Sequence, residues 1–269
     1  MFRLKRRGRV EYWATENFVE LGFVTHGFCT RRSGVSEEPF ASLNVAGLIG
    51  DNEVTVAQNL AAIETAFAVT EGRLVLMEQV HGDRVCVLDS QSDPPTRVPG
   101  CDGLLTSQPG VALGVKTADC VPLLFVDPVQ RVIGVAHAGW RGTALGIAGK
   151  MVRLFGERFG TRQEDLLVAI GPAIGQCCYE VDTPVREAFS GRRGSSSWLH
   201  ASPKRKGRWC LDLVAANRFE LEDLGVLASR ISHSGQCTAC RTNLFFSHRA
   251  EAGRTGRQLS LLMLTEKPQ

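Results

Sequence analysis

The densest apolar pattern in the chain lies between residues 111 and 136. It consists of three short runs, VALGVK, VPLLFVD and RVIGVA, and turn-forming residues separate the second run from the third. Short, nearly continuous apolar runs bounded by turns are typical of buried central strands. The second and third runs therefore predict an antiparallel hairpin. Such a hairpin brings Cys120, which opens one strand, beside His137, which closes the next.

Four segments carry apolar residues at the three- and four-residue spacing of an amphipathic helix. The first runs from Val56 to Phe67, and Asp51 is placed to cap it. The other three are expected from Asp182 through Phe189, from Gly142 to about Phe159, and from Asp212 to Leu224. Strand-like runs cluster and helices interrupt them irregularly, without the regular βαβ alternation of a Rossmann or TIM fold. The pattern favours an α+β fold in which mixed β-sheets are flanked by helices.

The composition is that of an ordinary globular protein. A chain of 269 residues that is 43% hydrophobic and 22% charged can bury a sizeable core, and we expect a single domain over residues 1–269. The net charge of +3 gives no reason to expect a nucleic-acid partner. Basic residues do crowd the N-terminus and residues 192–208. The second group lies in a Ser- and Gly-rich stretch, 190–208, which is expected to be an exposed loop.

No apolar stretch approaches the roughly 18 residues of a membrane span, so no membrane partner is expected. The basic N-terminus is not followed by the apolar segment of a secretory signal, and we expect a soluble, cytoplasmic protein. The nine cysteines show no disulfide-framework spacing and are expected to be reduced, including the adjacent pair Cys177-Cys178. Cys237 and Cys240 form a lone C-x-x-C. This pair is either redox-active, half of a zinc site, or without a function of its own.

Three residues at strand ends have the chemistry of metal ligands: His81, Cys120 and His137. Imidazole and thiolate are donors that Zn²⁺ prefers, and three protein ligands leave the fourth tetrahedral position open, as in catalytic sites. Their spacing matches no short metal motif, so a core thiol and two ordinary histidines remain an alternative. The small residues Ala138-Gly139 favour the metal site, because they let the backbone approach whatever the imidazoles hold.

Seven strings in order along the chain carry a resemblance to a known family. They are HGFCTRRSGVS (26–36), FASLN (40–44), EQVHG (78–82), TADCVPLL (117–124), AHAGWRG (136–142), AIGPAIGQCCYEV (169–181) and CTACRTNLFFSHR (237–249). With these strings the chain resembles the laccase-domain family. Its members are described as bacterial polyphenol oxidases, peptidoglycan editing factors and zinc-dependent purine nucleoside phosphorylases.

The resemblance implies that His81, Cys120 and His137 bind the metal, with Zn²⁺ as the cofactor and Cu²⁺ as the alternative. It implies phosphorolysis of adenosine, inosine, guanosine and methylthioadenosine, with adenosine deamination beside it. The partners are then purine nucleosides and phosphate, and the oligomeric state is not indicated. The chain departs from the family's pattern at Asn59-Leu60, where relatives carry Asn-Arg, and at His248, where they carry Tyr.

Five further residues have side chains suited to this chemistry. Asp119, beside Cys120, is a candidate general acid/base or a carboxylate that orients a ligand imidazole, and its alternative is to cap a turn. Arg141 and Arg31 can fork onto phosphate oxygens, unless they are ordinary ion-pair partners. Asn44 can bond to a base or ribose, and Phe246 can either stack on a purine or belong to the core.

Three other functions are weighed against the phosphorylase. A copper-dependent polyphenol oxidase needs several coppers, and six histidines make such a set hard to assemble. A peptidoglycan-precursor amidase would use Cys120 as nucleophile and His137 as base. A structural zinc or binding module is disfavoured, because a closed site needs a fourth Cys or His that cannot be assigned.

Overall fold

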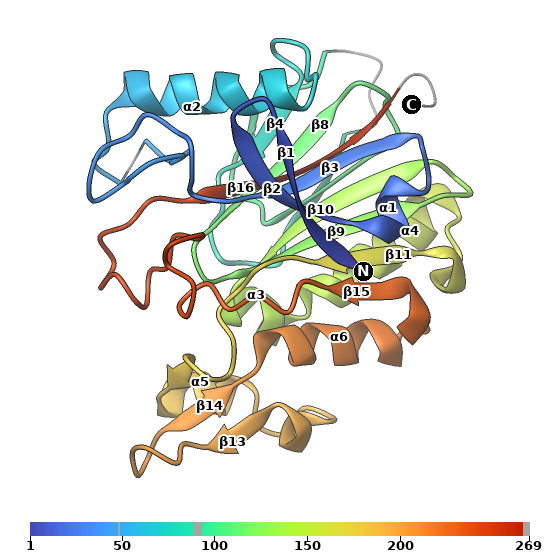
Figure 1. The fold of residues 1–269 in the computed structure, drawn as a ribbon. Coiled ribbons are helices and arrows are strands. Elements are labelled where there is room, and N and C mark those ends of the chain that lie inside the picture. Colours follow the sequence, from blue (N-terminus) through green and yellow to red (C-terminus); the bar gives the residue numbers. More distant parts are fainter. Residues whose placement is uncertain (48, 89–92, 266–269) are drawn as a thin grey trace.

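Two β-sheets face each other at the centre of the molecule (Figure 1). The computed structural model describes residues 1–47, 49–88 and 93–265. The first sheet has the order β1 (Phe2–Arg7), β2 (Val10–Thr15), β3 (Val24–Cys29), β16 (Gln258–Leu264), β8 (Ala112–Thr117), β4 (Leu74–Met77) and β6 (Arg97–Val98). The second has the order β15 (Ile231–His233), β11 (Leu167–Ile170), β9 (Val121–Asp127), β10 (Val132–Ala138), β7 (Gly103–Thr106) and β5 (Val85–Leu88). Both sheets combine parallel and antiparallel pairs.

The predicted hairpin is confirmed. Strands β9 and β10 pair antiparallel, with Pro122 opposite His137 and Val121 opposite Ala138. Every residue of both strands is buried. Leu124 and Val126 pack between the two sheets, whereas Leu123 and Phe125 face the helices on the other side. The run is apolar without alternation because the sheet is covered on both faces.

Helices cover the outer faces of the two sheets (Figure 1). Helix α2 (Glu53–Ala66) packs Ile63 onto the first sheet, and α4 (Ile147–Phe159) and α6 (Leu213–Asp223) cover the second sheet. The layers are therefore helix, sheet, sheet, helix, which confirms the expected α+β fold of mixed sheets flanked by helices. The shorter helices are α1 (Glu16–Val19), α3 (Trp140–Leu145), α5 (Thr183–Ala188), and the 3-10 turns η1 (Gln163–Asp165), η2 (Ser195–Ser197) and η3 (Ala228–Arg230).

Two details of the predicted helices were wrong. Asn52, not Asp51, caps α2 by accepting from the backbone of Val54, since Asp51 turns its carboxylate to other donors nearby. The helix expected from Gly142 to Phe159 is two helices, α3 and α4, which are divided at Gly146. Gly146 has φ of +80°, and a Cβ there would lie 2.8 Å from the Glu220 carboxylate, so only glycine fits this break.

The segment 190–208 is more ordered than its composition predicted. It contributes β13 (Leu199–Ala201) to a third small sheet with β14 (Trp209–Leu211) and β12 (Glu180–Val181). Trp198 is buried and packs edge-on against Phe189, with ring centroids 5.3 Å apart. The content of Ser, Gly and charged residues predicted a loop. It carries no information on this packing, because the packing depends on the single buried indole of Trp198.

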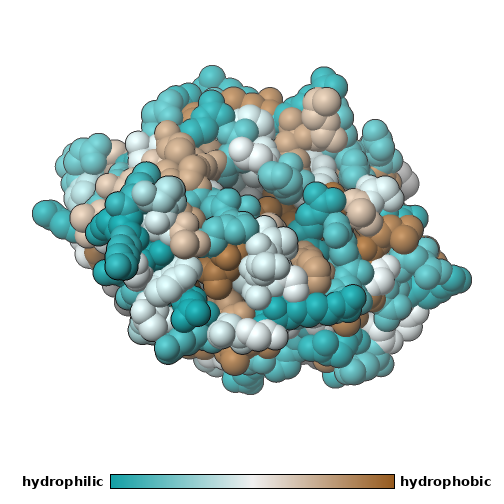
Figure 2. Space-filling view, turned by 90° about the horizontal axis from the view of Figure 1, so that it is seen from below, coloured by the Kyte–Doolittle hydropathy of each residue, from teal (hydrophilic) through white to brown (hydrophobic). Residues whose placement is uncertain are grey.

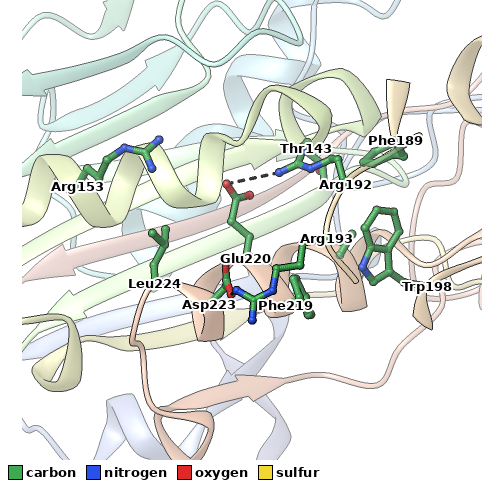
Figure 3. A pocket seen from close by; sticks show the side chains of 11 residues that line it. Thr143, Arg153, Phe189, Arg192, Arg193, Trp198, Phe219, Glu220, Asp223 and Leu224 are labelled. Carbon is green, nitrogen blue, oxygen red and sulfur yellow. Dashed lines mark hydrogen bonds and ion pairs between the residues drawn. The ribbon is translucent and has the colours of Figure 1, made fainter. Parts of the chain in front are cut away.

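The arginines of this segment are paired with acidic residues. Arg192 lies 3.7 Å from Glu220, and Arg193 and Arg205 form ion pairs with Asp223 and Glu180. A hollow of about 260 Å³ lies here between α4 and α6, and Figure 3 shows Arg192 reaching toward Glu220 within it. With Arg208 beside Asp182, each of the four arginines of the segment faces a carboxylate.

The face seen from below is mostly hydrophilic, with hydrophobic residues in separate groups between the polar ones (Figure 2). Across the described ranges, every helix is too short or too polar to cross a membrane.

Candidate metal site

The structure brings the three candidate ligands together at the open end of the β9–β10 hairpin, in the middle of the second sheet. His81 lies in the turn between β4 and β5, Cys120 in the turn before β9, and His137 near the end of β10. Their ligand atoms all lie within 4.8 Å of one another. The two imidazole rings meet edge-to-face, with centroids 4.7 Å apart. We call this group the three-ligand site.

Gly139 forms the wall of this site. A Cβ added there would lie 3.1 Å from both Cys120 Sγ and His81 Cδ2, and 3.8 Å from His137 Cε1. Contacts of that length leave little space for a side chain. The close backbone approach inferred from the small residues of this turn is therefore present in the fold.

Asp102 holds both histidines in place. Its Oδ1 lies 2.8 Å from His137 Nδ1, so that Nε2 of this imidazole is left to face an ion. The same carboxylate accepts hydrogen bonds from the backbone N–H groups of Val80, His81 and Gly82 at 2.8–3.1 Å. His81 has φ of +59°, an uncommon conformation for a side chain other than glycine, and these three bonds fix it.

The charges of the site are strongly coupled. Burial raises the pKa of the Cys120 thiol, but the neighbouring His137 and His81 imidazoles outweigh burial and lower it to about 6. Burial lowers the pKa of His137, but Cys120 and Asp102 outweigh it and raise it to about 9. The metal-free site therefore holds a thiolate beside an imidazolium at neutral pH.

The donor set fits a single ion with an open side. No fourth His, Cys, Asp or Glu joins the group within the part of the chain that the structure describes. His81 is exposed and Cys120 is half-buried, so one side faces solvent. Two neutral imidazoles and one thiolate suit zinc, and a Cys-His-His set also occurs in copper sites.

Asp119 lies beside this site, but its carboxylate is occupied. It accepts hydrogen bonds from Thr238 Oγ1, Ser247 Oγ and the backbone N–H of Arg249, at 2.6–2.7 Å. Its φ is +87°, so these bonds hold a strained turn directly before Cys120. The imidazole-orienting carboxylate is Asp102; the acid–base role of Asp119 stays a prediction.

Arg141 follows the site at the start of α3. It is exposed, and its guanidinium lies 4.3 Å from the centroid of the Trp140 ring. Burial and the charge of Cys120 raise the pKa of Tyr179, and the charge of Arg141 acts in the opposite direction. The Tyr179 phenol therefore lies on the same side of the molecule as Cys120 and Arg141. Within residues 1–47, 49–88 and 93–265, the guanidinium of Arg141 is thus supported by a ring and not by a carboxylate.

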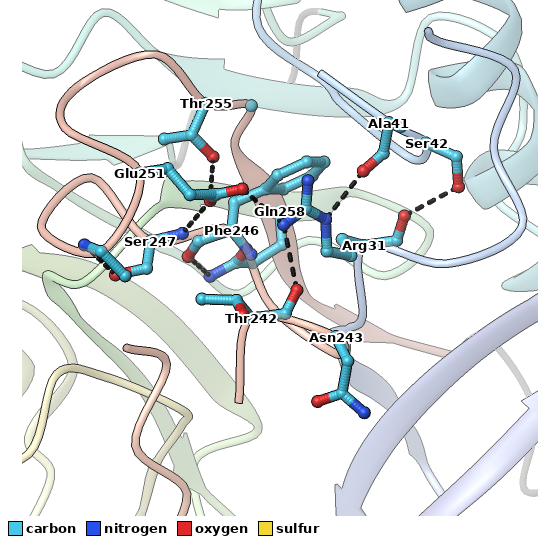
Figure 4. A network of polar contacts seen from close by, with 12 residues as sticks. Arg31, Ala41, Ser42, Thr242, Asn243, Phe246, Ser247, Glu251, Thr255 and Gln258 are labelled. Carbon is cyan, nitrogen blue, oxygen red and sulfur yellow. Dashed lines mark hydrogen bonds and ion pairs between the residues drawn. The ribbon is translucent and has the colours of Figure 1, made fainter. Parts of the chain in front are cut away.

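Arg31 and Phe246 lie in a buried network beside the site (Figure 4). Asn44 is also buried, and it lies with Phe246 beside Gly256. The Arg31 guanidinium stacks 4.4 Å above the Phe246 ring and pairs with Glu251 at 2.7 Å. Glu251 in turn accepts from the backbone N–H of Ser247, whose hydroxyl donates to Asp119. These side chains therefore connect to the Cys120 turn through protein partners, and their contact with substrate stays a prediction.

Sequence reasoning missed Asp102 and Arg257. The Arg257 guanidinium is largely buried, which lowers its pKa, while the charges of Cys120 and Asp119 act in the opposite direction. Asn44 Oδ1 accepts from the backbone N–H of Arg257 at 2.8 Å. Neither residue stands in a short motif with the ligands. The sequence offered one weak signal for each residue. Asp102 is a single Asp before an apolar run, and Arg257 is an Arg between Gly256 and β16.

The remaining histidines lie elsewhere in the fold. His26 is buried and accepts a hydrogen bond from the backbone N–H of Thr15, and burial lowers its pKa to about 3. Of the six histidines, only His81 and His137 belong to a group of three or more ligand-type side chains among the described residues. A multi-copper arrangement has no further imidazoles at this site.

Residues 25–265 match the family described as multi-copper polyphenol oxidoreductase laccase. The chain belongs to this family. The family description mentions several coppers, whereas the site in this member is a single Cys-His-His group.

Characterised relatives of this family member carry other names. The chain is 44% identical over 245 residues to purine nucleoside phosphorylase YlmD of Geobacillus stearothermophilus, covering 88% of each chain. It is 33% identical over 237 residues to adenosine deaminase RL5 of an unknown prokaryotic organism, covering 86% of this chain and 90% of that relative. The crystal structure of YlmD from G. stearothermophilus superposes with a TM-score of 0.90, covering 98% of this chain and 99% of that one.

Proposed function

We propose that this protein is a zinc-dependent purine nucleoside phosphorylase, acting on adenosine, inosine, guanosine and methylthioadenosine, with adenosine deaminase activity at the same site. The observation that carries the proposal is the three-ligand site with its solvent-facing side. It is supported by similarity along most of the chain to a relative named purine nucleoside phosphorylase, and by another named adenosine deaminase.

A zinc ion in this site would supply Lewis-acid assistance and lower the pKa of a coordinated water toward about 7. The protein's part is to hold the ligands. Asp102 fixes the tautomer and direction of His137, and Gly139 leaves the ligand side clear of side-chain atoms. Zinc is preferred over copper because the chain offers no second group of imidazoles for electron transfer in its described residues.

Phosphorolysis requires that phosphate approach C1′ of the ribose while the C1′–N9 bond breaks and the purine leaves with a proton. Arg141 is the guanidinium we assign to phosphate, because it is exposed and stacked, and no carboxylate among the described residues pairs with it. Arg257, close enough to sense the charge at Cys120, is a second positive group on this side. Asn44 acts through Arg257, because its side-chain oxygen accepts a hydrogen bond from the backbone N–H of Arg257.

Deamination makes a different demand, since water replaces the amino group at C6 of adenine and ammonia leaves. It needs no phosphate and so no guanidinium fork. The attacking water must lose a proton and the departing amine must gain one, and Asp119 is the carboxylate that we assign to carry this proton from the water to the amine. Its hydrogen bonds to Thr238 and Ser247 must then rearrange when substrate binds.

The test is product analysis with each of the four nucleosides, with and without phosphate, on protein of known zinc content. We expect free base and the sugar 1-phosphate (ribose 1-phosphate, or 5-methylthioribose 1-phosphate from methylthioadenosine) only when phosphate is present. Adenosine should give inosine without phosphate, and adenine, inosine and hypoxanthine with it. Absence of phosphate-dependent base release from all four nucleosides, in protein that carries zinc, would contradict the proposal.

A second candidate is a cysteine-nucleophile amidase acting on peptidoglycan precursors. One observation favours it: Cys120, His137 and Asp102 follow one another as thiolate, imidazole and orienting carboxylate, the order of a nucleophile triad. However, a triad has no use for a second imidazole, and His81 also bonds to the Cys120 thiol.

Copper-dependent phenol oxidation would instead show as copper in the purified protein and a visible copper–thiolate absorption band.

A further inference from the structure

Four cysteines from two distant parts of the chain meet outside the three-ligand site. This four-cysteine cluster consists of Cys177, Cys178, Cys237 and Cys240, whose sulfurs all lie within 4.8 Å of one another. We propose that the four-cysteine cluster binds a structural zinc ion, separate from the metal of the three-ligand site.

The size of the cluster fits one ion. A zinc–sulfur bond of about 2.3 Å in a tetrahedron places the sulfurs about 3.8 Å apart. Cys240 Sγ lies 3.3 Å from Cys178 Sγ and 3.6 Å from Cys177 Sγ, and no pair exceeds 4.8 Å. An iron–sulfur cluster would need a wider set, because further iron and sulfide atoms stand between its cysteine ligands.

The cluster is not a set of disulfides. All four cysteines are free, and the two short sulfur–sulfur distances are far longer than the roughly 2.05 Å of a disulfide bond. Cys240 lies close to both Cys177 and Cys178, and Cys237 contacts both Cys177 and Cys240, so the four sulfurs do not sort into two separate pairs. A single ion, in contrast, contacts all four sulfurs at once.

The backbone around Cys237 is already arranged for a thiolate. The N–H of Gly175 donates to Cys237 Sγ at 3.2 Å, and the N–H of Cys240 also donates to this sulfur. Cys237 and Cys240 have the C-x-x-C spacing that is common in structural zinc sites. Gly175 has to be small here, because its Cβ would lie 3.2–3.5 Å from the sulfurs of Cys177 and Cys237.

The two loops that carry the cluster also hold the turn before Cys120. In the first loop, the N–H of Ile174 donates to the carbonyl of Asp119 at 2.9 Å. In the second, Thr238 donates through its hydroxyl to the Asp119 carboxylate and through its N–H to the carbonyl of Ala173. An ion between the loops therefore stabilises the strained Asp119 turn from the outside.

Metal content measures this proposal directly. Zinc-supplemented wild-type protein should carry about two zinc ions per chain, one for each site. Cys237→Ser and Cys240→Ser should each lose one ion, Cys120→Ser should lose the other, and Cys210→Ser, outside both groups, should keep both. A wild type with a single zinc that disappears entirely in Cys120→Ser would overturn the proposal and leave the phosphorylase untouched.

Alkylation of the wild-type protein gives a second measurement that does not depend on variant folding. Peptides containing the four cysteines should react with iodoacetamide only after the metal is removed by a strong chelator, and all four should then react. If the four thiols react equally fast before and after chelation, or if two of them react only after reduction, the zinc site is refuted. The same experiment can be done on Cys120→Ser. If its four thiols resist iodoacetamide until the chelator is added, the zinc of the four-cysteine cluster is bound independently of the three-ligand site.

Discussion

Asp102 contacts His137 at two points. Its backbone carbonyl accepts from the backbone N–H of His137 at 2.7 Å, and its carboxylate lies 2.8 Å from Nδ1 of the ring. The carboxylate also accepts three N–H groups of the His81 turn. One buried aspartate thus positions two of the three candidate ligands, and burial would raise its pKa if these hydrogen bonds did not lower it.

Replacing this carboxylate should weaken metal binding without removing a ligand. In Asp102→Asn, the amide N–H₂ faces backbone donors or the imidazole N–H, so at least one donor loses its acceptor. We expect zinc affinity at the three-ligand site to fall about 10- to 100-fold. Competition with a zinc-binding dye measures this. Asp127→Asn is the control, since Asp127 is as buried as Asp102 but lies at the turn end of the β9–β10 hairpin, away from the ligands. An equal loss there would attribute the effect to general destabilisation.

The Cys120→Ser variant separates the metal site from the amidase. If the thiolate is a ligand, the variant should lose zinc from this site and both nucleoside activities, because a hydroxyl is a poor zinc donor at neutral pH. If the thiolate is a nucleophile, the variant should keep its metal, and the wild type should form a thioester adduct with a slow amide or ester substrate. Intact-protein mass spectrometry and metal analysis distinguish the two outcomes.

Arg141→Ala should impair phosphorolysis more than deamination. Loss of a guanidinium that contacts phosphate should lower kcat/KM for phosphate about 10- to 100-fold. Deamination should change less, because its nucleophile is water, which offers the guanidinium no comparable contact. Arg186→Ala is a matched control, because Arg186 is also exposed and stacks on an indole, that of Trp209, at 4.9 Å. Equal losses of both activities in Arg141→Ala would assign this residue to structure.

Zinc uptake should release protons in a manner set by the two shifted groups. Between the pKa of Cys120 at about 6 and that of His137 at about 9, the thiol is already ionised and the imidazole still protonated. The ligands of each ion bound at the three-ligand site should then release close to one proton, more below pH 6 and none well above pH 9. A coordinated water with a pKa near about 7 should add up to one further proton above that pH. Calorimetric titration in buffers of different ionisation enthalpy counts these protons.

Cys120→Ser, titrated in the same way, gives the contribution from the rest of the chain.

The same two pKa shifts affect the stability of the metal-free protein. The contribution of His137, whose pKa is raised, is lost as pH rises through about 9, and that of Cys120, whose pKa is lowered, is lost as pH falls through about 6. Proton release that does not vary with pH would contradict the ion pair.

The sequence predicted what depends on neighbours in the chain. The β9–β10 hairpin follows from two apolar runs and a turn, and it alone brings Cys120 beside His137. Asp102 was missed because its partners lie 20 to 35 residues away and are mostly backbone groups, which leave no pattern. The C-x-x-C at Cys237 looked incomplete for the same reason: Cys177 lies 63 residues from Cys240.

Strand β16 is the last strand of the described residues, but it lies in the middle of the first sheet, between β3 and β8. Before it is added, β1–β2–β3 and β8–β4–β6 share no pairing. The segment that leads into it supplies Ser247 and Arg249, which hold Asp119. A chain in which this segment and β16 have not yet docked therefore has a divided sheet and an unsupported Cys120 turn at the same time. Quality control that removes incompletely folded chains would thereby also remove those with an incomplete site.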